Sequence, residues 1–133
     1  MKQATLILPL AALALATPAL AGPAPSPEAR LAKLLEGRVA GKPVDCIDPR
    51  VNSSTQVIEK TAIVYGSGHT IYVQRPTNAE VLSRDDVLVT DLRGSGQLCT
   101  VDVVRLHDRT GGWYRGFVNL TKFVPYTRVA AEK

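Results

Sequence analysis

The sequence has few of the residues from which catalytic and metal-binding centres are built. It contains two cysteines and two histidines, which show neither the C-x-x-C spacing of a redox centre nor the ligand spacing of a zinc site. The G-x-S-x-G motif of hydrolases, the G-x-x-x-x-G-K-[ST] phosphate loop and the EF-hand calcium loop are all missing. We therefore predict a non-catalytic protein that needs no cofactor and no metal.

Long apolar runs are also scarce, and the one present lies at the N-terminus. Residues 6–16 form an apolar run after Lys2, and Ala19 and Ala21 occupy the −3 and −1 positions of an A-x-A cleavage site. The run is shorter than the roughly 20 residues that a membrane span needs. We predict a signal peptide over residues 1–21 and a periplasmic or secreted mature protein that does not span the membrane. The alternative is a retained N-terminal anchor.

The two cysteines, Cys46 and Cys99, have only one possible pairing. Outside the cytoplasm such a pair is expected to be oxidised. The bond would close a loop of about 50 residues, which the chain-entropy model values at roughly 4 kcal/mol of stability. Because the cysteines are far apart in sequence, we predict a structural disulfide and not a redox-active one.

A short linker and one helix precede the main domain. Residues 22–27 contain three prolines, which predict an extended linker. Ser26 is a favourable N-cap, and the leucines that follow are spaced three and four residues apart, as on one face of a helix. We predict a short helix over residues 28–37, with Gly37 as its stop signal.

Short runs rich in β-branched and aromatic residues follow, separated by turns that contain glycine or asparagine. The clearest is a hairpin with arms at residues 61–65 and 70–74. A long strand is expected over residues 98–106, with a bulge near Val103 where the alternation changes phase. Asn78 is a candidate cap for one helical turn.

These runs together predict the fold class. We expect a mainly β protein: a small antiparallel β-barrel or sandwich of about six short strands, with one short N-terminal helix. The β-rich domain is predicted over residues 43–127, and a frayed tail over residues 128–133.

Basic and aromatic residues concentrate in the C-terminal third. The chain carries a net charge of +4, and from Arg105 onward the only acidic residues are Asp108 and Glu132. Aromatic side chains mixed with arginine are typical of surfaces that bind glycans, lipid head groups or proteins. We expect these residues to meet an anionic envelope component or an envelope protein, and not nucleic acid. The candidate binding residues are Arg109, Trp113, Tyr114, Arg115, Lys122 and Arg128. Phe117 and Phe123 are expected in the core under the alternative interpretation.

Two other functions remain open. A small hydrolase would pair His69 or His107 with one of the aspartates, and the candidates are Asp86, Asp102 and Asp108. An inhibitor of a secreted enzyme would instead present a rigid loop, such as residues 109–116.

Several short motifs are spread across the domain. They are Cys46-Ile47, the later Leu98-Cys99 followed by Asp102, and the closing F-x-P-Y at residues 123–126. With these motifs the chain, over residues 44–126, resembles a domain-of-unknown-function family of small exported proteobacterial proteins. The resemblance implies an envelope location and a β-rich fold. It implies no activity and assigns no functional residue.

Overall fold

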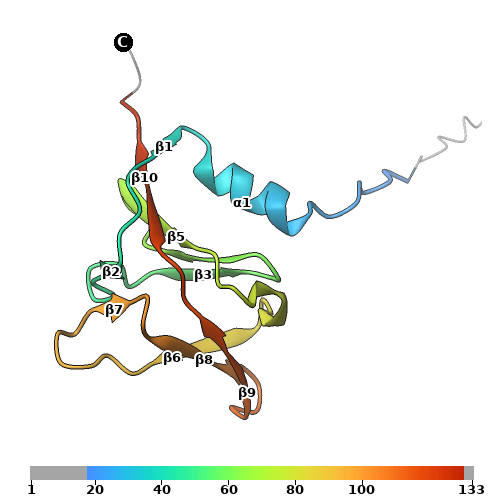
Figure 1. Ribbon diagram of the computed structural model, residues 1–133. Coiled ribbons are helices and arrows are strands. Elements are labelled where there is room, and N and C mark those ends of the chain that lie inside the picture. Colours follow the sequence, from blue (N-terminus) through green and yellow to red (C-terminus); the bar gives the residue numbers. More distant parts are fainter. Residues whose placement is uncertain (1–17, 131–133) are drawn as a thin grey trace, which may run out of the picture.

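The computed structural model describes residues 18–130, so most of the predicted signal peptide lies outside the described residues. The fold is mainly β, as predicted, with antiparallel strands and one α-helix. The described residues form ten strands instead of about six, and they do not close into a barrel (Figure 1). The elements are α1 (Pro27–Leu35), β1 (Arg38–Ala40), β2 (Cys46–Ile47), β3 (Thr55–Ile58), β4 (Ala62–Tyr65), β5 (Thr70–Gln74), the 3-10 turn η1 (Ala79–Val81), β6 (Asp86–Thr90), β7 (Leu98–Cys99), β8 (Val103–Asp108), β9 (Tyr114–Asn119) and β10 (Phe123–Arg128).

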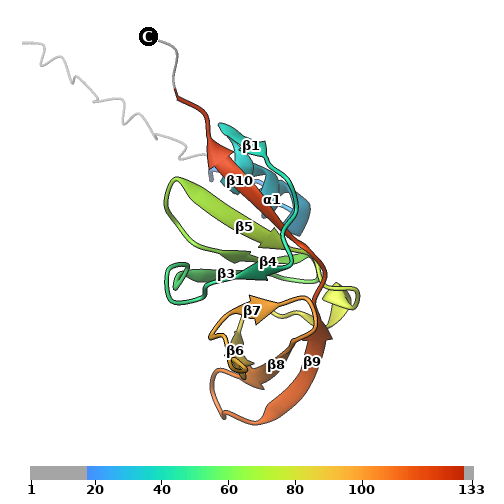
Figure 2. The same ribbon diagram turned by 60° about the vertical axis from the view of Figure 1, so that its left-hand side comes forward.

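Two sheets and a helix form the layers of the domain. The larger sheet has the strand order β1-β10-β5-β4-β3, the smaller has the order β6-β8-β9, and β2 and β7 form a separate two-stranded ladder. Helix α1 lies against one side of the larger sheet, and the smaller sheet lies on its other side (Figure 1 and Figure 2). In the described residues no ladder joins the two sheets, so side chains must hold them together.

Strand β4 is buried along its whole length because its two faces belong to different cores. Successive residues of a strand point to opposite faces of the sheet. Ala62 and Val64 accordingly pack in the cluster that contains Leu31 of α1. Ile63 and Tyr65 pack in the cluster between the two sheets. The hairpin of β4 and β5 is confirmed, and it forms the centre of the domain.

Helix α1 is fixed at both ends. The Ser26 hydroxyl accepts a hydrogen bond from the Ala29 amide at 3.2 Å, which confirms the predicted N-cap. The Arg75 guanidinium donates to the Glu28 carboxylate at 2.9 Å and lowers the pKa of Glu28. Gly37 follows the helix with a φ of +70°, a conformation that favours glycine.

Among residues 18–130, no helix is both long and apolar enough to cross a bilayer.

The larger sheet extends beyond the range 43–127 that we predicted for the β-rich domain. β1 precedes this range, and β10 includes Arg128, which we placed in the frayed tail. The two strands pair antiparallel, with Arg38 opposite Arg128. Three-residue strands such as β1 are too short to show an alternation, so the sequence pattern does not reveal them.

The single long strand predicted up to Leu106 is wrong. The structure has two strands, β7 and β8, separated by a turn. The Asp102 carboxylate accepts a hydrogen bond from the Cys99 amide at 2.8 Å, and this contact folds the chain over at the end of β7. The register irregularity lies between Leu106 and His107 and not near Val103.

Two side-chain amides fasten the chain where it passes from the smaller sheet to the larger one. Gln74, fully buried, accepts from the Thr121 amide and donates to the Thr121 carbonyl, both at 2.8 Å. The Asn78 side chain binds β9 in the same way. It accepts from the Asn119 amide and donates to the Phe117 carbonyl, both at 2.9 Å. The Asn78 side chain therefore satisfies backbone groups of β9. It forms no cap hydrogen bond with η1, contrary to our prediction. Each amide replaces a missing strand partner.

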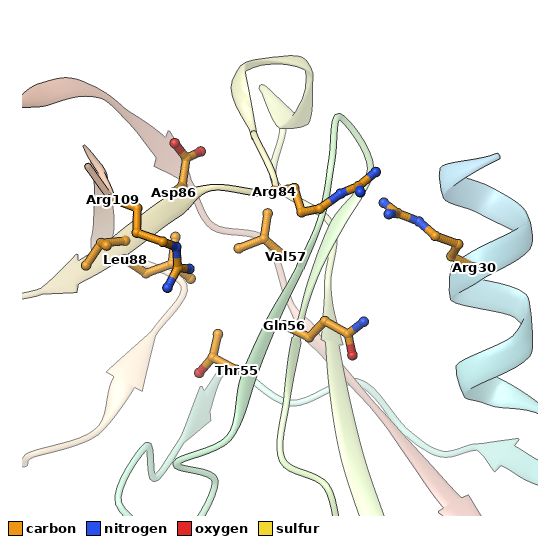
Figure 3. Close-up of a pocket in the computed structure, with 9 residues that line it drawn as sticks. Arg30, Thr55, Gln56, Val57, Arg84, Asp86, Leu88 and Arg109 are labelled. Carbon is orange, nitrogen blue, oxygen red and sulfur yellow. The ribbon is translucent and has the colours of Figure 1, made fainter. Parts of the chain in front are cut away.

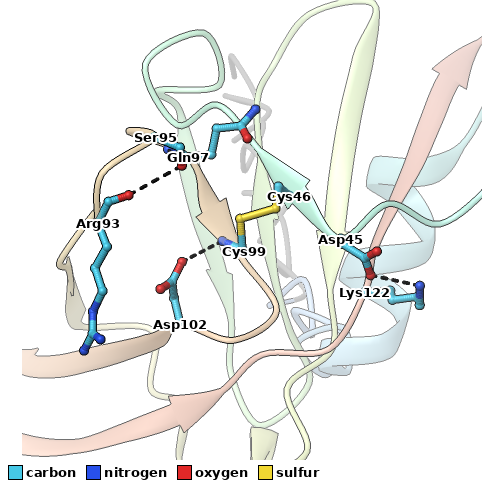
Figure 4. The surroundings of a disulfide bond; sticks show 8 residues. All are labelled: Asp45, Cys46, Arg93, Ser95, Gln97, Cys99, Asp102 and Lys122. Atoms are coloured by element: carbon cyan, nitrogen blue, oxygen red, sulfur yellow. Dashed lines mark hydrogen bonds and ion pairs between the residues drawn. A yellow bond between two sulfur atoms is a disulfide. The ribbon is translucent and has the colours of Figure 1, made fainter.

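The predicted disulfide is present. Cys46 and Cys99 lie directly opposite each other in the β2–β7 ladder and are bonded (Figure 4). The bond links positions 53 residues apart. Next to it, Lys122 forms an ion pair with Asp45 at 2.9 Å. The disulfide thus joins the start of the β-rich domain to the segment between β6 and β8 of the smaller sheet.

We predict that Gln74→Leu lowers the free energy of unfolding by about 2 kcal/mol, since it leaves the Thr121 amide and carbonyl without these partners. Urea denaturation measures this loss. Tyr65→Phe is the matched control, because the buried Tyr65 hydroxyl has no hydrogen-bond partner among the described residues. Tyr65→Phe should leave the stability unchanged or raise it slightly. Equal losses in the two variants would contradict the role given to Gln74.

Candidate functional site

The six candidate binding residues do not share one surface. Four of them lie on the hairpin of β8 and β9. Lys122 lies in the link between β9 and β10, beside the disulfide. Arg128 ends β10, where that strand pairs with β1. The four residues on the hairpin are Arg109, Trp113, Tyr114 and Arg115.

The structure pairs three of the five described basic residues of the C-terminal third with acidic residues from earlier in the chain. Arg105 forms an ion pair with Asp91 at 3.0 Å. Arg115 binds the carboxylate of Asp86, and Lys122 binds Asp45. The net positive charge counted along the sequence is therefore partly neutralised in space, and Arg109 is the one arginine of this hairpin that no ion pair engages in the described residues.

Asp86 is the most constrained of these acidic residues. Its side chain is fully buried, its Oδ1 accepts from the Arg115 guanidinium, and its Oδ2 accepts from the Ser83 amide at 2.7 Å. A buried carboxylate requires such partners, because an unpaired buried charge is very costly. Arg115 is consequently a structural residue of the smaller sheet and is not free to bind a partner through its Nη1.

The outer face of the smaller sheet is apolar and open to solvent. Val87, Val103, Tyr114 and Phe117, which we call the apolar face, are between 40% and 56% exposed. Strand register brings them together: Val87 lies opposite His107 across β6 and β8, and His107 lies opposite Tyr114 across β8 and β9. The rings of His107 and Tyr114 meet edge to face at 5.8 Å. The inward residues of the same strands fill the core.

Trp113 stands at the tip of the hairpin, next to the apolar face, and is 60% exposed. The tip is tightly hydrogen-bonded: the Asp108 carboxylate accepts from the amides of Thr110 and Gly111 at 2.9 and 2.7 Å. The Trp113 ring lies directly over Gly111, so that a Cβ there would come within 1.6 Å of it. The indole is therefore held in one place although it is exposed.

The geometry of the described residues does not support the hydrolase alternative. Among the described residues, no side-chain hydrogen bond joins either histidine to an aspartate. The His107 ring contacts the Gly112 carbonyl at 3.0 Å. Asp86 and Asp102 are engaged as described above, and Asp108 holds the hairpin tip. Residues 18–130 contain no group of three or more potential metal ligands.

The comparisons with known proteins add no relative. A scan against protein-family models found no match, and searches of curated proteins and of solved structures found no similar protein.

The sequence predicts the apolar face only in part. Trp113 and Tyr114 are among the predicted binding residues, but Phe117 is expected in the core under one interpretation, and neither Val87 nor Val103 is predicted to bind a partner. The alternation in Gly116-Phe117-Val118 was the available signal, because Val118 is fully buried and Phe117 must then point outward.

We predict that Gly111→Ala displaces the Trp113 ring. Trp113 is the chain's only tryptophan, so its fluorescence reports on the hairpin tip alone. The emission should shift to longer wavelength, and quenching by acrylamide should increase. Gly68→Ala is the control, because a Cβ at Gly68 meets nothing within 4 Å. Unchanged emission in Gly111→Ala would show that the ring is not seated on the tip.

Proposed function

We propose that the protein is an exported, non-catalytic binding module of the cell envelope, which docks on a protein partner through the apolar face and Trp113. The observation that carries this proposal is the exposure of aromatic side chains. The chain has only seven aromatic residues, and Trp113, Tyr114 and Phe117 are all about half exposed or more.

A protein partner fits this surface better than an anionic one. Tryptophan and tyrosine are enriched at the centres of protein interfaces, where they bury a large apolar area at low entropic cost. The neighbouring Arg105 and Arg115 are neutralised by Asp91 and Asp86. The partner should accordingly present an apolar patch with few charges. Because the hairpin tip is preorganised, little conformational entropy would be lost on docking.

Export is supported by the predicted signal peptide, by the disulfide and by the resemblance to exported proteobacterial proteins. A structural disulfide is typical of proteins outside the cytoplasm. We predict that protein recovered from the envelope has an intact mass that starts at Gly22, and that Cys46 and Cys99 are alkylated only after reduction. A mass that retains residues 1–21, or thiols that react without reduction, would contradict export.

Docking is tested by site-specific photocrosslinking from the full chain. A photoreactive amino acid in place of Phe117 should give one discrete adduct with an envelope protein. The same group in place of Val51, which is exposed in a loop before β3, is the control and should give none. The partner identified by mass spectrometry is then purified. Phe117→Ser should weaken its binding about 5- to 30-fold, equivalent to about 1–2 kcal/mol, and Val51→Ser should not.

The stability of Phe117→Ser provides the internal check. Phe117 is half-buried in a strand, so Phe117→Ser should lower the free energy of unfolding by no more than about 2 kcal/mol and leave the domain folded. A crosslink to a second copy of this chain or to lipid, or equal affinities of the two serine variants, would contradict the proposal.

The rigid hairpin tip also favours the inhibitor alternative. An inhibitor presents a preorganised loop to the active site of its target enzyme. In that case the crosslinked partner would be a secreted hydrolase, and adding the protein would block its activity. A partner without catalytic activity would exclude this alternative.

A further inference from the structure

A groove of about 450 Å³ opens between helix α1, strand β3 and strand β6 (Figure 3). β3 is the edge strand of the larger sheet and β6 is the edge strand of the smaller one. Three arginines from distant parts of the chain line this groove: Arg30 from α1, Arg84 from the segment before β6, and Arg109 from the β8–β9 turn. The guanidinium groups of Arg30 and Arg84 point toward each other across the outer end of the groove (Figure 3).

The groove carries an excess of positive charge. Among the described residues, Glu59 is the one carboxylate that pairs with Arg30 and Arg84, and its Oε1 lies 4.0 Å and 3.5 Å from their Nη2 atoms. Both distances exceed the 2.7–3.2 Å typical of a hydrogen bond. In the described residues, no ion pair engages Arg109. The carboxylate that lines the groove, Asp86, is neutralised by Arg115. The groove therefore carries two guanidinium groups that share Glu59, and a third, that of Arg109, without an ion pair.

Arg30 is the most informative of the three. Its Nε and Nη2 atoms are buried, and neither has a hydrogen-bond partner among residues 18–130. Buried donors without acceptors cost free energy, and charged donors cost the most. A folded protein keeps such a group at a modest cost only when something supplies the missing acceptors. The Arg30 side chain is 24% exposed, so a small rotation that turns its guanidinium into the groove would let an oxyanion there supply them.

We infer that this groove binds a phosphate group. The planar fork of arginine matches two oxygens of a phosphate, and several guanidinium groups can share its remaining oxygens. A phosphate carries a charge of about −1.5 to −2 near pH 7, which balances the three arginines and Glu59. Thr55 and Gln56 in the lining offer neutral donors. The groove is larger than a phosphate ion, so the group could be free or part of a lipid head group.

Isothermal titration of the full mature chain with inorganic phosphate, at constant ionic strength held with chloride, tests the site. We expect saturable binding that Arg84→Ser weakens at least about tenfold. Arg84 is 63% exposed in its side chain, so its loss should not disturb folding. Arg93→Ser is the matched control, because it removes the same charge from an exposed loop that does not line the groove. Arg30→Lys keeps the positive charge but loses the planar guanidinium fork, so it should also weaken phosphate binding.

A second arm identifies the source of the phosphate. Flotation with vesicles that contain phosphatidylglycerol, with and without free phosphate as a competitor, shows whether a lipid head group occupies the groove. Vesicle binding that is lost in Arg84→Ser and competed by phosphate would assign the lipid source, and titration without flotation would assign the free ion. An absence of binding in both arms, or equal weakening by Arg84→Ser and Arg93→Ser, would overturn the inference.

The site is separable from the proposed docking surface. Val87 borders both the groove and the apolar face, whereas Phe117 belongs only to the face. Phe117→Ser should thus leave phosphate binding unchanged, and Arg84→Ser should leave photocrosslinking from the apolar face unchanged. Loss of one activity without the other shows which of the two proposals has failed.

Discussion

The burial of both faces of strand β4 is the constraint on which the rest of the structure depends. All four of its residues are buried, two toward α1 and two toward the smaller sheet. The larger sheet therefore requires a cover on each side. A nine-residue helix such as α1 would be marginal on its own in water. It persists because Leu31 completes a core that β4 and β5 have already assembled, and because Arg75 holds its first turn.

The second cover is the smaller sheet, which shares no ladder with the larger one in the described residues. Its position depends on apolar contacts and on a few side-chain hydrogen bonds. Gln74 and Asn78 bind the backbone at the two ends of the segment that leaves β9 and enters β10. The disulfide fixes the β2–β7 ladder at another corner, with about 4 kcal/mol expected from the chain-entropy model. The buried Gln74 amide, with both its groups satisfied, adds specificity to apolar packing, which is not directional.

Local signals were sufficient for part of this fold. The β4–β5 hairpin, the cap at Ser26 and the Cys46–Cys99 pairing all follow from neighbouring residues or from a pair with no alternative. The two-residue strands β2 and β7 carry no periodicity and exist because their partners hold them. The break before β8 depends on one side chain, Asp102, which competes for the Cys99 amide. Such competition between a side chain and a ladder is hard to anticipate from sequence.

The candidate site shows the same limit for charge. Counting along the chain assigns the positive charge to the C-terminal third, but ion pairs are set by proximity in space and not by position in the sequence. Asp45, Asp86 and Asp91 come from earlier strands and loops and neutralise Lys122, Arg115 and Arg105. The hairpin that looked basic is therefore an apolar surface with embedded, paired charges. The excess positive charge reappears in the groove, where Arg109 lines the same hollow as two arginines that precede it by at least 25 residues. No pattern in the sequence links these three, because only the packing of α1 and β6 beside β3 brings them together.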